Sequence, residues 1–174
     1  MSISFAPNGT LHLTLIAAVA VCRALERTCG ISPKIKWIND IYLNSRKVGG
    51  ILCESTFKSN EISKAVVGIG LNIMTNEFPP DLCDIAGAIE TDTPREVIIA
   101  AIVDEFFKIY ETSEDIISEY SERMFLIGKK VIIDNKEVTV KRVENDGALI
   151  VGDKSGEQRI FNTENMILKK TTRF

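Results

Sequence analysis

Histidine is nearly absent from this sequence, and cysteine is sparse and unpaired. The 174 residues include one histidine and four cysteines, and no two cysteines are spaced as a C-x-x-C pair. Zinc sites need several closely spaced Cys or His ligands, so this spacing excludes the common structural zinc motifs. We therefore expect no metal site built from these residues, a structural role for His12, and four reduced thiols that behave as small hydrophobic residues.

Blocks of like charge and long apolar runs are missing as well. The formal net charge is −3, and a nucleic-acid-binding surface needs a basic patch that this sequence does not contain. The longest apolar run, residues 13–22, is interrupted by Thr14 and is shorter than the roughly 20 residues that cross a bilayer. The first residues also lack the basic segment of a secretory signal. We expect a cytoplasmic globular protein with neither a membrane nor a nucleic-acid partner.

The first two thirds of the sequence contain both helix and strand patterns. Apolar residues recur at helical spacing from about Leu11 to Thr28, and Gly30 is well placed to end that helix. The same period returns over 94–111 and 114–124. Short apolar segments predict strands at 1–5, 34–37, 41–43, 47–48, 51–56 and 64–71. This order predicts an α+β domain with a mixed β-sheet.

The last third of the sequence changes to a period of two. Five short strands are predicted at 130–133, 137–143, 148–151, 158–161 and 166–169. Five short strands within about forty residues are typical of a small barrel of SH3-like size. We place the boundary near Leu126-Ile127-Gly128, which predicts one domain over 1–126 and a second over 127–174.

One run, KWINDIYLNSRKVGGILCE over residues 36–54, carries most of the functional information. Lys36 ends an apolar strand, and a fixed ammonium group there is suited to neutralising a carboxylate or phosphate. Gly49-Gly50, and Gly68 and Gly70 further along, lie inside predicted strands. Glycine is unfavourable there unless something approaches the backbone closely. A flat ligand on the sheet and tight packing within the protein both remain open as explanations.

These segments resemble the central motifs of the biotin protein ligases, which read KWPND, GGIL.E and GxGxN at matching spacings. The resemblance implies a class II synthetase/biotin ligase-like catalytic domain followed by an SH3-like domain. It also implies an enzyme that joins biotin and ATP, with Mg²⁺, into biotinyl-5′-AMP. Biotin then passes to a lysine of a biotin carboxyl carrier domain, which is the implied partner. Members of the family also form homodimers through this sheet.

The resemblance carries the family's binding residues onto particular positions. Lys36 matches the catalytic lysine that contacts biotin and its adenylate. Gly68 and Gly70 match the strand backbone beneath the bicyclic ring, and Asn72 matches the asparagine on the nucleotide and magnesium side. Apolar pocket residues correspond to Ile51 and Leu52.

The sequence departs from the family pattern in two respects. Ile38 stands where the family has proline, and no Gly/Arg-rich segment of the GRGRRGR kind occurs. We therefore expect an incomplete, N-terminally truncated catalytic domain whose 174 residues alone bind biotin weakly and form the adenylate poorly. Two alternatives stay open: a non-catalytic binding or assembly module of the same fold, and a lipoate ligase-like acyl ligase.

Overall fold

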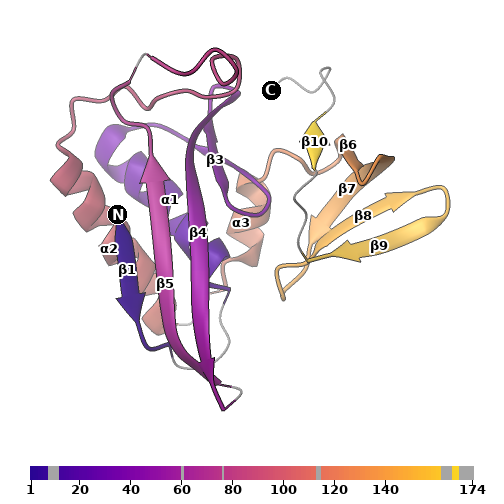
Figure 1. Ribbon diagram of the computed structural model, residues 1–174, viewed down its shortest axis with the longest axis horizontal. Coiled ribbons are helices and arrows are strands. Elements are labelled where there is room, and N and C mark those ends of the chain that lie inside the picture. The colour runs from indigo at the N-terminus through magenta and orange to yellow at the C-terminus, as the bar shows by residue number, and fades with distance from the viewer. Residues whose placement is uncertain (8–11, 60, 76, 113–114, 162–165, 169–174) are drawn as a thin grey trace.

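The computed structural model describes residues 1–174 apart from 8–11, 60, 76, 113–114, 162–165 and 169–174. Within the described residues the chain forms three α-helices and two five-stranded sheets (Figure 1). The predicted α+β class is confirmed. The same part of the chain has no helix that is both long enough and apolar enough to span a bilayer.

The first sheet has the strand order β1-β5-β4-β3-β2. Its strands are β1 (Ser2–Phe5), β2 (Lys34–Lys36), β3 (Asp40–Leu43), β4 (Arg46–Lys58) and β5 (Glu61–Leu71). All four neighbouring pairs are antiparallel, so the expected mixed sheet was wrong in this respect. Short turns join β2 to β3, β3 to β4 and β4 to β5, and such connections permit only antiparallel neighbours.

A two-residue hairpin turn, Asn44-Ser45, joins β3 to β4. Asn44 and Ser45 have φ angles of 48° and 64°. Left-handed conformations at both central positions match the right-handed twist of the flanking strands, and asparagine tolerates them better than most residues. The hairpin therefore brings β4, with its Gly49-Gly50 pair, alongside β3.

Within the described residues, helices cover only one face of the first sheet. Figure 1 shows α1 (Leu13–Cys29) behind the long strands β4 and β5, and α2 (Arg95–Thr112) at the β1 side of the sheet. Apolar side chains on that face are at most 4% exposed and form the core with α1, among them Ile35, Ile41, Ile51, Val67 and Ile69. Gly30, with a φ of 66°, ends α1 as predicted. The opposite face is left without a helical layer.

A short helix, α3 (Ile117–Arg123), fixes the end of β2. Its Arg123 donates hydrogen bonds to the carboxylates of Glu26 on α1 and Glu119 on α3 itself. The Tyr120 hydroxyl donates to the Ile38 carbonyl at 3.0 Å. The segment that follows Lys36 is thereby tied to the helical layer.

The second sheet has the order β10-β6-β7-β8-β9 and is antiparallel throughout. All five strands that the sequence predicted are present, with bounds that differ by a few residues: β6 (Lys130–Ile133), β7 (Lys136–Val143), β8 (Leu149–Asp153), β9 (Gly156–Ile160) and β10 (Ile167–Leu168). Figure 1 shows this sheet beside the β3 and α3 side of the first one. Its loop at Gly147 reaches the first sheet.

Candidate active site

Four neighbouring strands align charged residues and glycines in one row. Lys36 on β2 is paired with Asp40 on β3, Asp40 with Gly50 on β4, and Gly50 with Gly70 on β5. Directly paired residues of antiparallel strands project from the same face, roughly 5 Å apart. The alternation of the strands places this row on the face opposite the buried Ile51 and Ile69. A lysine, a carboxylate and a glycine surface therefore meet on the open face.

Packing inside the protein explains one of these glycines but not the others. A Cβ atom at Gly49 would lie 2.5 Å from Leu71 Cδ2 and 2.7 Å from the Gly70 carbonyl oxygen, so Gly49 has no room for a side chain. At Gly50, Gly68 and Gly70 the nearest atom to an added Cβ is 3.5 Å away or more, an ordinary contact distance. Internal packing does not require these three glycines, so a flat ligand can lie on the open surface that they leave. We call Gly50, Gly68 and Gly70 the glycine floor.

Lys36 lies beside this floor in an environment that disfavours its protonated form. Partial burial lowers the pKa of its ammonium group, Asp40 opposes that shift, and Lys47 adds to it. The Lys47 Nζ atom is 2.5 Å from Asp40 Oδ1, so Asp40 pairs closely with the second lysine. Lys36 is therefore a half-buried cation, and a bound anion would stabilise its protonated form.

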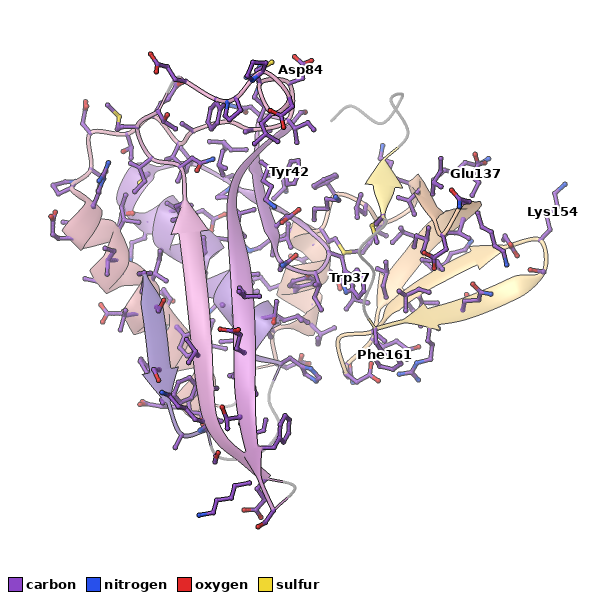
Figure 2. The ribbon with its side chains drawn as sticks, in the orientation of Figure 1. Trp37, Tyr42, Asp84, Glu137, Lys154 and Phe161 are labelled. Carbon is purple, nitrogen blue, oxygen red and sulfur yellow. The ribbon has the colours of Figure 1, made fainter. Side chains whose placement is uncertain are left out.

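The segment after Lys36 is held from both sides. The Trp37 indole is 5% exposed and donates from Nε1 to the Gly147 carbonyl of the second sheet's loop at 3.1 Å. Figure 2 shows Trp37 on the side of the first sheet that faces the second. Asn39 Nδ2 donates to the Ile51 carbonyl at 2.8 Å, and the Ile51 amide donates back to the Asn39 carbonyl. The peptide bond between Trp37 and Ile38 is cis.

Ile51 and Leu52 lie on opposite faces of β4. Ile51 is 3% exposed within the core under α1, whereas Leu52 is 63% exposed and is paired with Gly68 on the open face. The two side chains therefore point in opposite directions, because successive residues of a strand project to opposite faces. Leu52 stays with the glycine floor, and Ile51 reaches it only through its backbone.

Asn72, just beyond β5, organises the loop over residues 74–92. Its backbone amide donates to the Val48 carbonyl at 2.8 Å, and its Nδ2 donates to the Gly87 carbonyl at 3.1 Å. A cleft of about 640 Å³ lies between this loop and the β3–β4 turn, with Arg46 among its lining residues. Asn72 therefore marks the end of the glycine floor at which a loop and a cleft begin.

Sequence reasoning missed Lys47 as a member of this cluster. Regular alternation from Gly50 places residue 47 on the opposite face, but the pairing of β3 and β4 shifts register between Ile41 and Tyr42. Such an irregularity re-aims side chains. The RK doublet before Gly-Gly was visible in the sequence, but the bulge that turns Lys47 toward Asp40 was not.

Residues 4–72 match the model of the Biotin/lipoate A/B protein ligase family. The bifunctional ligase/repressor BirA of Bacillus subtilis (strain 168) is 36% identical over 104 residues, covering 59% of this chain and 32% of that protein. Biotin–protein ligase 2 of Arabidopsis thaliana is 32% identical over 170 residues, covering 79% of this chain and 49% of that protein.

The fold comparison covers nearly the whole chain. The crystal structure of biotin protein ligase from Aquifex aeolicus superposes with a TM-score of 0.80 at 22% identity, covering 97% of this chain and 82% of that one. The same enzyme in complex with biotin and ATP gives a TM-score of 0.76 at 23% identity, covering 97% and 78%. The chain spans about a third to a half of the length of the two curated relatives. The match over residues 4–72 shows that this part of the chain is similar to the biotin/lipoate A/B protein ligase family.

Proposed function

We propose that this chain is the biotin-binding part of a biotin protein ligase. The enzyme would form biotinyl-5′-AMP from biotin and ATP and pass biotin to a lysine of a biotin carboxyl carrier domain. The observation that carries the proposal is the row of Lys36, Gly50 and Gly70, with Gly68 on the same face, because internal packing does not require a glycine at any of these three positions. The Aquifex aeolicus enzyme, whose fold the chain shares, was solved with biotin and ATP.

Four of the proposed site residues would contact biotin on the open face. Gly68 and Gly70 form the floor under the bicyclic ring, and Leu52 on the same face supplies apolar contact. Lys36 faces the carboxylate end. When that carboxylate attacks the α-phosphorus of ATP and pyrophosphate leaves, an ammonium group at this place stabilises the negative charge on the reacting oxygens. In the second step the carrier lysine attacks the acyl carbon, AMP leaves, and the lysine loses a proton.

Asn72 is proposed for the nucleotide end, where the loop and the cleft begin. Its Nδ2 is engaged by the Gly87 carbonyl, so its amide oxygen remains the group to offer a ligand. Mg²⁺ prefers oxygen ligands and retains several waters or substrate phosphates. Among the described residues no group of three His, Cys, Asp or Glu side chains is arranged to hold a metal ion. The amide oxygen of Asn72 is proposed to face a Mg²⁺ ion that arrives with the phosphates of ATP.

The second sheet is proposed to be a separate SH3-like domain over residues 127–174, with the catalytic domain over 1–126. The antiparallel order β10-β6-β7-β8-β9, with β10 returning to β6, supports a small barrel. Both domains are proposed to reside in the cytoplasm, where four unpaired cysteines stay reduced.

Biotin is favoured over lipoate by the names of the relatives. The Arabidopsis thaliana relative is named a biotin–protein ligase and the Aquifex aeolicus protein a biotin protein ligase, although the family model spans biotin and lipoate enzymes. A purely non-catalytic module has no observation in its favour. Calorimetric titration of the chain with biotin and with lipoate tests the choice, and lipoate binding tighter than biotin binding would reverse it.

Biotin affinity is expected to fall at alkaline pH, earlier than an ordinary lysine would make it fall. Burial lowers the pKa of Lys36, so its ammonium group is lost below the usual lysine pKa of about 10.4. Biotin stays a carboxylate throughout, so affinity decreases as pH rises through the lowered pKa. Calorimetry from pH 7 upward measures this decrease. In Lys36→Arg the cation persists, and an equally steep decline in that variant would show that Lys36 is not responsible.

The chain is also proposed to form a homodimer through its first sheet. β1 is an edge strand of that sheet, and exposed edges pair with other chains unless they are blocked. Sedimentation velocity at tens of micromolar should show a dimer that dissociates on dilution. A single monomeric species across that range would contradict the proposal.

A further inference from the structure

The helix α3 lies at the outer edge of β2, the strand that ends in Lys36. β2 is an edge strand of the first sheet, and Met124, the residue that follows α3, forms an isolated parallel bridge with Ile35. An ion pair of Arg123 with Glu26 fixes α3 against α1. The backbone that leads into the proposed site is therefore attached to a helix outside the first sheet.

Tyr120 is the residue of α3 that reaches past the end of β2. Its side chain is completely buried, and its hydroxyl donates to the Ile38 carbonyl at 3.0 Å. Burial raises the pKa of this hydroxyl, and the nearby Cys22 and Asp40 raise it further, so the group stays a proton donor. The Ile38 carbonyl, two residues beyond Lys36 in the chain, is thereby held in one place.

The place of this hydrogen bond matters because residue 38 is an isoleucine. Proline fixes its own φ angle at about −65°, whereas isoleucine permits several backbone conformations. The motif KWPND has proline where this chain has Ile38. Trp37 and Asn39, on either side, are anchored by side-chain hydrogen bonds of their own. The Tyr120 hydroxyl supplies a constraint on the residue between them.

We propose that Tyr120 is a positioning residue for Lys36: its hydroxyl fixes the Ile38 carbonyl and so directs the Lys36 ammonium group toward the biotin carboxylate. This inference rests on the proposed function. The competing explanation is that Tyr120 is an ordinary core residue whose hydroxyl has found a partner, as the hydroxyls of buried tyrosines usually do.

The test compares biotin with biotin methyl ester, which has the same ring system but no negative charge. Tyr120→Phe removes the hydroxyl and keeps the ring. Tyr110→Phe is the matched control, because Tyr110 packs against Phe5 of β1, at the opposite edge of the first sheet from β2. Ile38→Pro is made alone and together with Tyr120→Phe. Calorimetry measures the affinity of each variant and of the unsubstituted chain for both ligands.

Tyr120→Phe should bind biotin about tenfold more weakly than the unsubstituted chain, the cost of misplacing a charge-assisted hydrogen bond. Its affinity for the methyl ester should equal that of Tyr110→Phe, because the ester brings no charge to Lys36. Adding Ile38→Pro should restore biotin binding to Tyr120→Phe, since proline constrains the segment without the hydroxyl. Ile38→Pro alone should bind biotin like the unsubstituted chain.

Thermal unfolding checks that each variant folds. If one does not, all titrations are repeated in sucrose, which favours the folded state.

Three results would overturn the inference, and they differ in meaning. Equal losses for biotin and its methyl ester in Tyr120→Phe, or no loss for either, would make Tyr120 a core residue only and leave the proposed function intact. A loss that Ile38→Pro does not restore would show that the hydroxyl does not act through residue 38. Absence of biotin binding in both the unsubstituted chain and Tyr110→Phe would remove the proposed function, and with it the role of Tyr120.

Discussion

Replacing Lys36 with alanine should lower the rate of biotin transfer to a carrier lysine by about a hundredfold or more, the usual cost of losing a group aimed at the charge of a transition state. Stability should change little, within about half a kcal/mol, as for most partly exposed side chains. Burial lowers the pKa of Lys36, so the charged form of this lysine does not stabilise the folded chain. Lys36→Arg should recover only part of the rate, because a planar guanidinium does not reproduce a compact ammonium group.

The rate would be measured in a fusion protein that adds a part of the Bacillus subtilis relative that this chain does not span. The chain spans about a third of its Bacillus subtilis relative, so we would fuse the preceding segment of that relative to Met1. Transfer of labelled biotin to a carrier domain gives the rate, and urea unfolding gives the stability. Lys64→Ala serves as the control for loss of an exposed lysine. Undiminished transfer by Lys36→Ala would remove Lys36 from the mechanism.

Substituting alanine for Gly70 should separate binding from folding. An added Cβ atom meets nothing closer than the Gly50 carbonyl oxygen at 3.9 Å, and alanine should raise stability by roughly 0.5–1 kcal/mol relative to glycine in a strand. The same methyl group would intrude on a ligand lying against the backbone. Overpacking of this kind costs about 1–3 kcal/mol, so biotin affinity should fall by about tenfold or more.

Gly49→Ala is the opposite case and completes the experiment. Its Cβ atom would lie 2.7 Å from the Gly70 carbonyl oxygen. The backbone must shift to relieve that contact, which should destabilise the chain by about 1–3 kcal/mol. Urea unfolding and biotin calorimetry on both variants measure the contrast. Unchanged biotin affinity in a folded Gly70→Ala protein would show that the glycine floor is not where the ligand lies.

The proposed role of Lys36 comes from a short run of sequence. A lysine at a strand end and glycines within predicted strands predict a ligand-binding sheet, because each departs from what a strand alone prefers. Period and turn residues predicted the helices and strands well. The turn at Asn44-Ser45 and the end of α1 at Gly30 could be predicted because each depends on the backbone conformation of only one or two residues.

The sequence by itself determined the element types, their approximate bounds, and the candidate status of Lys36, Gly70 and Asn72. Only the tertiary structure decided which face of the first sheet the helices cover. That choice sent Ile51 into the core and left Leu52 on the glycine floor. Only the register of β3 against β4 turned Lys47 toward Asp40. Both outcomes depend on contacts between segments far apart in sequence, and no local pattern of residues encodes which of two faces will be covered.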